Sequence, residues 1–197
     1  MKTIFKESIY SILSLFYNSR NKPYHLRDIA RNVNLNESTV SARLTELEKE
    51  DILKSEKDGN LKKFKVKIKA IPKIFPLFDD EKLEHLPLLR KNAIKEYLNT
   101  SKTKPLLMII FGSTAKGNYK DDSDIDILEV FSQKTNTKEA KSHAQALTGI
   151  KIQTFQITEE NFYKELKIKE DRVIQSALNT GFPVFNNKYF YELIYYE

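Results

Sequence analysis

The stretch that decides the fold is residues 112–128, GSTAKGNYKDDSDIDIL. The apolar run before it, residues 106–111, predicts a buried strand that ends in a glycine-serine turn. Asp124 and Asp126 stand two positions apart, and side chains with that spacing share one face of a strand. Paired carboxylates suit Mg²⁺, and the backbone N–H groups of a glycine-serine turn bind phosphate oxygens. The stretch therefore contains the parts of a metal-dependent phosphate site.

The order of these residues resembles the signature of the minimal nucleotidyltransferases of the DNA polymerase β superfamily. The matched positions are Gly112, Ser113, Ala115, Gly117 and the run SDIDI at residues 123–127. The resemblance implies a small mixed sheet with helices, of the polymerase β palm type. It implies Asp124 and Asp126 as catalytic residues that bind Mg²⁺. It also implies an NTP, most simply ATP, held by Gly112, Ser113 and Lys116. A solvated acidic loop is the alternative, and the alternation of Ile125 and Ile127 with the acids argues against it.

The third acidic residue of that family has no counterpart here. Its strand usually reads like VDLVxLTxEE, and residues 152–160 read IQTFQITEE, which puts Gln153 in place of the acid. A neutral amide adds no negative charge to a two-metal site and cannot act as a base. Three interpretations stay open: a slow enzyme, a nucleotide binder without catalysis, or an enzyme that recruits Glu159 or Glu129.

Composition limits the class of protein. The 197 residues are 30% charged and 40% hydrophobic, which suits a globular protein of one large domain or two small ones. Cysteine is absent, so disulfides and thiolate-metal sites are excluded. There is no run of 18 apolar residues and no signal-peptide pattern, so we expect a cytoplasmic protein without a membrane span. Residues 1–70 hold 15 Lys and Arg against 9 Asp and Glu, whereas residues 71–197 are balanced. A polyanion is therefore the expected partner of the first third.

The first third predicts three helices and a hairpin. Apolar spacing predicts helices over residues 4–17 and 24–33, and a third from the N-cap Asn36 to about Glu50. Two strands follow, at residues 52–56 and 61–70, and the Asp-Gly pair between them is a strong hairpin signal.

This order resembles a winged helix-turn-helix DNA-binding domain over about 70 residues, similar to regulators that bind operators as dimers. The resemblance implies that the third helix enters the major groove of double-stranded DNA. Its candidate contacts are Ser38, Thr39, Ser41, Ala42 and Arg43. Lysines alternate with apolar residues along the wing, and the candidates for phosphate contacts are Lys63, Lys65 and Lys67. Two alternatives remain: a protein-protein module, and a lysine face that only discourages aggregation.

In the rest of the chain, helix-breaking residues set the boundaries of the predicted domains and helices. We expect an N-terminal domain over residues 1–70 and a transferase-like domain over 104–197. Between them, prolines predict a linker of short turns, and residues 88–99 predict a connecting helix. Further helices are expected at residues 137–147, 159–167 and 170–179, the last closed by Gly181 as a C-cap. Aromatic residues near the C-terminus (Tyr189, Phe190, Tyr191, Tyr195, Tyr196) serve either the core or a dimer contact, or else stack on a base.

These expectations combine into an α+β protein of two domains. The first hypothesis is Mg²⁺-dependent transfer of a nucleoside monophosphate from an NTP to a hydroxyl acceptor on a protein or RNA. The second is a transcriptional regulator, acting as a homodimer, whose transferase domain senses nucleotide or only dimerises. The third is an antitoxin-like modifier of a toxin partner, because the known antitoxins of this family resemble the core.

Overall fold

The chain forms two units that divide between Phe78 and Asp79 in a computed structural model, which describes residues 6–196. The division falls inside the segment 71–103 that we assigned to the linker. Ile4 and Phe5, at the start of the first predicted helix, lie outside the described residues.

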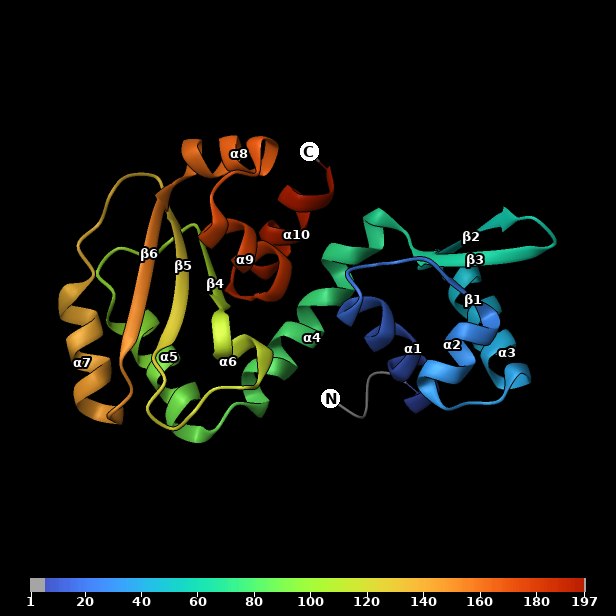
Figure 1. Ribbon diagram of the computed structural model, residues 1–197, viewed down its shortest axis with the longest axis horizontal. Helices are drawn as coiled ribbons and strands as arrows, with labels where there is room; N and C mark the ends of the chain where they lie inside the picture. Colours follow the sequence, from blue (N-terminus) through green and yellow to red (C-terminus); the bar gives the residue numbers. More distant parts are fainter. Residues whose placement is uncertain (1–5, 197) are drawn as a thin grey trace. The chain divides into compact units, whose positions relative to one another are not determined.

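The first unit consists of helices followed by a small antiparallel sheet (Figure 1). Its elements are α1 (Glu7–Asn18), β1 (Tyr24–His25), α2 (Leu26–Val33), α3 (Glu37–Lys49), β2 (Leu53–Asp58), β3 (Leu61–Val66) and a short helix at Ile68–Ala70. The strand order is β1-β3-β2. The helix-helix-turn-helix-hairpin order is confirmed.

Helix α3 begins at the predicted N-cap and packs one stripe against the core. The Asn36 side chain accepts a hydrogen bond from the backbone N–H of Thr39 at 2.7 Å, which is the N-cap contact. Val40, Leu44 and Leu47 are all buried, so one stripe of α3 faces the core.

Two predicted boundaries in this unit are wrong. Tyr24 and His25 do not open the second helix, because they pair with β3 opposite Phe64 and Lys63. The second wing strand ends at Val66 rather than at residue 70, because the chain there turns into a short helix. Lys67 therefore follows the wing strand instead of lying in it.

The segment predicted as a linker of short turns is instead the helix α4 (Ile71–His85). Pro76 lies inside it and lacks the N–H that would donate to the fourth residue before it. The helix persists because its first half is anchored in the first unit: the rings of Phe75 and Phe78 lie 5.4 and 5.2 Å from that of Tyr17. Burial of these rings outweighs the lost hydrogen bond.

The second unit is a four-stranded mixed sheet with helices, as predicted (Figure 1). Its elements are α5 (Leu88–Thr100), β4 (Leu107–Phe111), α6 (Gly112–Lys116), β5 (Ile125–Phe131), α7 (Lys138–Thr148), β6 (Ile152–Thr158), α8 (Glu159–Ile168), α9 (Arg172–Thr180), β7 (Phe182–Phe185) and α10 (Asn187–Tyr196). The strand order is β6-β5-β4-β7, with β5 and β6 parallel and the other pairs antiparallel.

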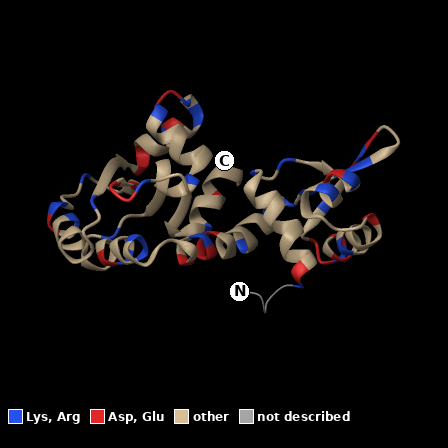
Figure 2. Cartoon of the chain, turned by 60° about the horizontal axis from the view of Figure 1, so that its bottom comes forward, with Lys and Arg blue, Asp and Glu red and all other residues tan. Residues whose placement is uncertain are grey.

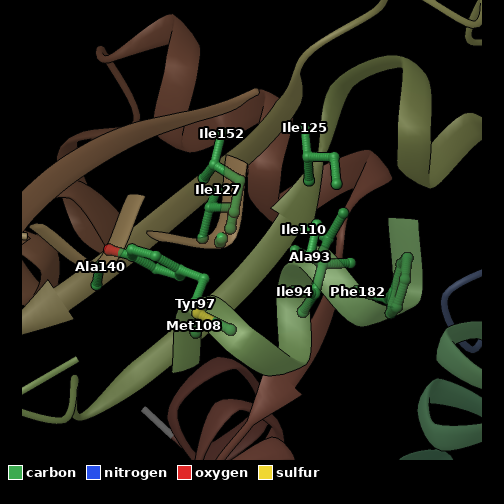
Figure 3. Close-up of a cluster of buried hydrophobic side chains, with 11 residues drawn as sticks. Ala93, Ile94, Tyr97, Met108, Ile110, Ile125, Ile127, Ala140, Ile152 and Phe182 are labelled. Atoms are coloured by element: carbon green, nitrogen blue, oxygen red, sulfur yellow. The ribbon is translucent and has the colours of Figure 1, made fainter. Parts of the chain in front are cut away.

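The two faces of this sheet differ in chemistry. On the core face, isoleucines of β4 and β5 pack against α5 and α7 (Figure 3). The cluster includes Ala93, Tyr97, Met108, Ile110, Ile125, Ile127, Ala140 and Ile152. Because strand side chains alternate, Asp126, Leu128, Gln153 and Phe155 point to the opposite face, which we call the carboxylate face.

The C-terminal part follows the prediction in outline. Gly181 is the C-cap of α9, as predicted, but with φ at −79° this position does not need the left-handed freedom of glycine. It is required for another reason: an added Cβ would lie 2.6 Å from the backbone oxygen of Ile110 on β4. Phe190 and Tyr191 are fully buried, so for these two residues the core interpretation holds.

Candidate functional site

The glycine-serine turn and the carboxylate strand meet at one end of the sheet. β4 and β5 are antiparallel, with Phe111 opposite Asp126, so the residue after β4 lies beside that aspartate. Gly112 has φ at +67°, and an added Cβ would lie 2.2 Å from the Asp126 Oδ2. Glycine is required there twice over, for the left-handed backbone and for the approach of the carboxylate.

The paired carboxylates crowd each other. Burial raises the pKa of the Asp126 carboxyl, and the negative charge of Asp124 raises it further. Asp124 is partly compensated, because the Lys151 Nζ lies 3.0 Å from its Oδ2. The lysine is mostly exposed, so this ion pair is weak. The site therefore holds negative charge that the chain itself does not fully neutralise.

Gln153 occupies the place that the family alignment gave to the third acid. The parallel register of β5 and β6 sets Gln153 directly opposite Asp126, on the same face. The two acids considered as substitutes lie elsewhere. Glu129 is on the core face, where the Tyr97 hydroxyl donates to it at 2.5 Å. Glu159 follows the far end of β6, about 20 Å along the strand from Gln153, and accepts from the Tyr189 hydroxyl.

The remaining predicted residues flank the turn. Ser113 is half-buried in the first turn of α6, and Lys116 is exposed at the end of the same helix. Lys116 has no ion-pair partner among residues 6–196. Its charge is thus available beside the turn.

A buried arginine fixes the loop between the turn and the carboxylates. Arg90, on α5, is only 3% exposed and donates to the Thr114 Oγ1 at 3.0 Å. It also donates to the backbone oxygens of Lys120 and Ser123, at 2.9 and 2.8 Å. Its guanidinium stacks 4.1 Å from the ring centre of Tyr119. Arg90 thereby positions the segment that leads into Asp124.

The donor set suits one divalent cation better than two. Two carboxylates, the Ser113 hydroxyl and the Gln153 amide oxygen are hard oxygen donors, which Mg²⁺ prefers. Within residues 6–196, no group of three or more His, Cys, Asp or Glu is arranged to hold a metal ion. A second Mg²⁺ has no third carboxylate to bind it.

In the first unit, α3 presents small polar side chains to solvent. Ser38, Ser41, Ala42 and Thr45 are exposed, and Thr39 is half-buried. Arg43 points elsewhere: its Nε donates to the Ser8 Oγ at 3.1 Å and its Nη1 pairs with Glu46. Of the predicted DNA contacts on α3, Arg43 is thus tied to α1 and Glu46, and the Ser38 hydroxyl donates to the Asn36 Oδ1 at 2.7 Å.

Basic and acidic residues lie on the neighbouring strands of the wing (Figure 2), and the predicted wing lysines are paired with acids. Lys63 lies 2.7 Å from Asp58, and Lys65 lies 3.3 Å from Glu56. Lys67 bonds to Asp51, whose pKa falls to about 2 through the hydrogen bonds from Lys67 and then from Lys69. The lysine-rich pattern therefore overstates the free positive charge of the wing.

Two other lysines at the wing tip carry no such partner. Lys57 and Lys62 are directly opposite each other in the β2–β3 register, and both are exposed. Neither has an ion pair with an acid of the described chain, residues 6–196. They share a face with the buried Phe64, which is the face turned to the helices of the unit. A groove of about 440 Å³ lies between α3 and this tip, lined by Ser41, Thr45 and Lys62 among others.

Comparison with known families agrees with this geometry. Residues 92–189 match the family model of polymerase beta nucleotidyltransferases, and residues 9–54 match that of winged helix-turn-helix DNA-binding domains. The chain joins a winged helix-turn-helix DNA-binding domain to a nucleotidyltransferase domain of the polymerase beta family. No curated protein and no solved structure matches the chain significantly. No helix within residues 6–196 is long and apolar enough to cross a membrane.

Sequence reasoning missed residues that contact the candidate site of the nucleotidyltransferase domain. Arg90 lies on the same face of α5 as the buried Ala93, Ile94 and Tyr97. A charged residue on an apolar helix face is unusual, so the sequence pattern could have marked Arg90 as a candidate. Lys151 precedes β6 by one residue, and only the parallel register of β5 and β6 brings it to Asp124. In residues 1–70, Lys57 and Lys62 did not stand out among the 15 lysines and arginines, because counting charges ignores ion pairing.

Proposed function

We propose that the chain transfers a nucleoside monophosphate from an NTP to a hydroxyl acceptor with the help of Mg²⁺. The observation that carries the proposal is the contact of the Asp126 carboxylate with Gly112, which joins the phosphate turn to the acidic strand. Asp124 crowds Asp126, and a cation relieves that repulsion. A pair of acids kept at an energetic cost beside an anion-binding turn is typical of a functional site.

Each residue has a distinct task in this reaction. Asp124 and Asp126 hold the metal, which when bound neutralises phosphate charge and polarises the α-phosphoryl group. The turn at Gly112 and Ser113 holds the β- and γ-phosphates, and Lys116 adds positive charge beside them. The acceptor oxygen bonds to the α-phosphorus while the bond from that phosphorus to the bridging oxygen breaks, releasing pyrophosphate.

The proposed site lacks a strong base to accept the proton of the acceptor hydroxyl. Gln153 stands where the family places a carboxylate, and its amide does not accept a proton at neutral pH. The proton leaves to solvent instead, so transfer by this chain is slow compared with a three-carboxylate site.

A second candidate function rests on that same residue. Gln153 beside Asp126 leaves a site that binds Mg·NTP without turning it over. The chain is then a regulator, acting as a homodimer, whose DNA affinity responds to nucleotide.

Incubation with each NTP labelled at the α-phosphate, in an extract of the source cells, separates the two functions. Transfer predicts that label enters a macromolecule and is lost in the Asp124→Ala/Asp126→Ala variant. The sensor predicts no incorporation by the natural chain and a gain of incorporation in Gln153→Asp. Label incorporated equally by the double variant contradicts the transfer proposal.

For the DNA-binding domain, α3 enters the major groove with Ser38, Thr39, Ser41 and Ala42 near base edges and phosphates. Lys57 and Lys62 at the wing tip supply phosphate contacts, since they need not break an ion pair first. Lys63, Lys65 and Lys67 contribute less, because DNA competes with their acidic partners. Arg43 contributes through α3's position, because it ties α3 to α1.

A further inference from the structure

A cavity opens on the carboxylate face of the nucleotidyltransferase sheet, beyond the acids. It has a volume of about 650 Å³ and lies between β5 and β6 on one side and α8 and α9 on the other. That volume is in the range of small-molecule sites, roughly 300–1,000 Å³. All of its lining belongs to the second unit.

The cavity begins two residues along the strands from the proposed phosphate site. Leu128 and Phe155 line it, and each stands two residues after a member of the site, Asp126 and Gln153. Two residues of a strand span roughly 7 Å. The ring of Phe155 packs against that of Phe111 at 5.5 Å, next to Asp126, so an aromatic surface connects the acids with the cavity.

The direction of the cavity fits one part of a nucleotide. The phosphate turn follows β4, Asp126 is on β5 and Gln153 is on β6, so these groups form a line across the strands. In phosphoryl transfer the attacking and leaving oxygens lie in line, and the remaining substituents of the phosphorus point sideways. Because the line from the attacking to the leaving oxygen then runs across the strands, the nucleoside, a sideways substituent of the phosphorus, extends along the strands. The cavity lies along the strands.

The lining also suits a nucleobase. Its floor is apolar, with Leu128, Phe155 and Ile157 from the strands and Ile174 from α9. At its edge, Lys134 and Asn161 offer hydrogen-bond donors, and neither is in an ion pair within the described residues. Two acids in the lining are already engaged, because Asp171 accepts from the backbone of Val173 and Glu165 accepts from that of Asp171. A flat, uncharged ring with polar edges matches these surfaces.

We infer that this cavity holds the nucleoside of the bound NTP, with the base stacked on or near Phe155. The inference rests on the proposed function, because it takes the phosphates to lie at Gly112 and Ser113. It assigns base selection to α8, α9 and the far half of β6, which lie outside the signature residues.

Calorimetric titration of the full chain tests this with two kinds of ligand, both with Mg²⁺. One is tripolyphosphate, which has no nucleoside. The other is the set of four α,β-methylene NTPs, which cannot be cleaved at the bridge. We expect at least one of the four to bind about ten-fold tighter or more than tripolyphosphate, as base stacking on an aromatic ring gives.

Three variants locate that preference. Ile157→Trp fills the cavity from a half-buried strand position and should abolish the preference while leaving tripolyphosphate binding unchanged. Phe155→Leu keeps an apolar residue but removes the ring, and should lower methylene-NTP affinity several-fold. It decides the question if the tryptophan variant does not fold. Leu147→Trp adds the same ring to an exposed position of α7, on the other side of the sheet, and should change neither ligand.

The outcomes separate the inference from its premise. Equal affinity for tripolyphosphate and all four methylene NTPs overturns the nucleoside cavity and keeps the phosphate site. A preference for one NTP that survives in both Ile157→Trp and Phe155→Leu also overturns it. Binding of neither kind of ligand overturns the proposed function and the inference together.

Discussion

The wing of the first unit and the turn end of the second both carry acids, yet their environments are opposite. On the wing, Asp51, Glu56 and Asp58 each lie against lysines, and their pKa values are lowered by hydrogen bonds from those lysines. At the turn, Asp126 has a raised pKa, through burial and through Asp124. Acids that pair with lysines reduce the net positive charge of a surface. Acids that repel each other are typical of a site that binds a cation.

The largest effect is expected where the turn and the acids touch. Gly112→Ala puts a Cβ against the Asp126 carboxylate and strains a backbone at φ +67°. We expect Mg²⁺-dependent nucleotide binding to be lost and the free energy of unfolding to fall by about 1–3 kcal/mol. Calorimetry and urea denaturation measure the two quantities.

A matched control separates strain from contact. Gly149 has φ at +73° and no heavy atom within 4 Å of an added Cβ. Gly149→Ala should therefore lower the free energy of unfolding by a similar amount, through backbone strain, and leave nucleotide binding intact. Equal loss of binding in both variants would show that the contact of Gly112 with Asp126 does not matter.

A smaller effect is expected on the wing, where we propose that lysines without an acidic partner make the phosphate contacts. Lys62→Ala removes a charge at the tip that has no acidic partner within residues 6–196, whereas Lys65→Ala removes one that shares Glu56 with Lys54. The first should weaken DNA binding several-fold and reduce the slope of log affinity against log salt by about 0.9, as loss of one phosphate contact does. The second should change the slope by less. Fluorescence anisotropy across a salt series measures both, and a larger slope change for Lys65→Ala contradicts the comparison.

The smallest effect concerns stability against pH, and the two regions should differ in sign. The raised pKa of Asp126 means that its ionisation opposes folding, a penalty absent below the unfolded pKa and complete once pH exceeds the folded pKa. Asp126→Asn should thus be slightly more stable than the natural chain at pH 7 and no different near pH 3. Asp51, with its pKa lowered to about 2, favours folding above its unfolded pKa and loses that contribution as pH falls. Asp51→Asn should therefore be slightly less stable than the natural chain at pH 7, as thermal unfolding measures.

The sequence predicted the parts of this protein whose signals are local. Residues 112–128 predicted the turn and the acidic strand, and Asn36 predicted the start of α3. What it missed depends on partners far away in the chain. Pro76 predicted a break, but burial of Phe75 and Phe78 holds the helix together. A lysine pattern predicted a basic wing, but acids on the neighbouring strand pair with it.

The residues of the candidate site divide in the same way, into those with a local sequence signal and those that depend on distant partners. Asp124 and Asp126 could be read from their spacing, and the position of Gln153 from the alignment of residues 152–160 with the family pattern. The clamp by Arg90 could not, because it joins α5 to a loop about 30 residues later, as the hydrogen bond to Lys120 shows. The cavity beside Phe155 could not either, because helices from a later part of the chain form its other wall.

The most direct test of the central claim is titration of the natural chain with each NTP, with Mg²⁺ and with EDTA. If the crowded acids hold a place for a cation, binding is micromolar with Mg²⁺, and it is lost with EDTA and in the Asp124→Ala/Asp126→Ala variant. NTP binding that is the same with EDTA, or in the double variant, would contradict the account.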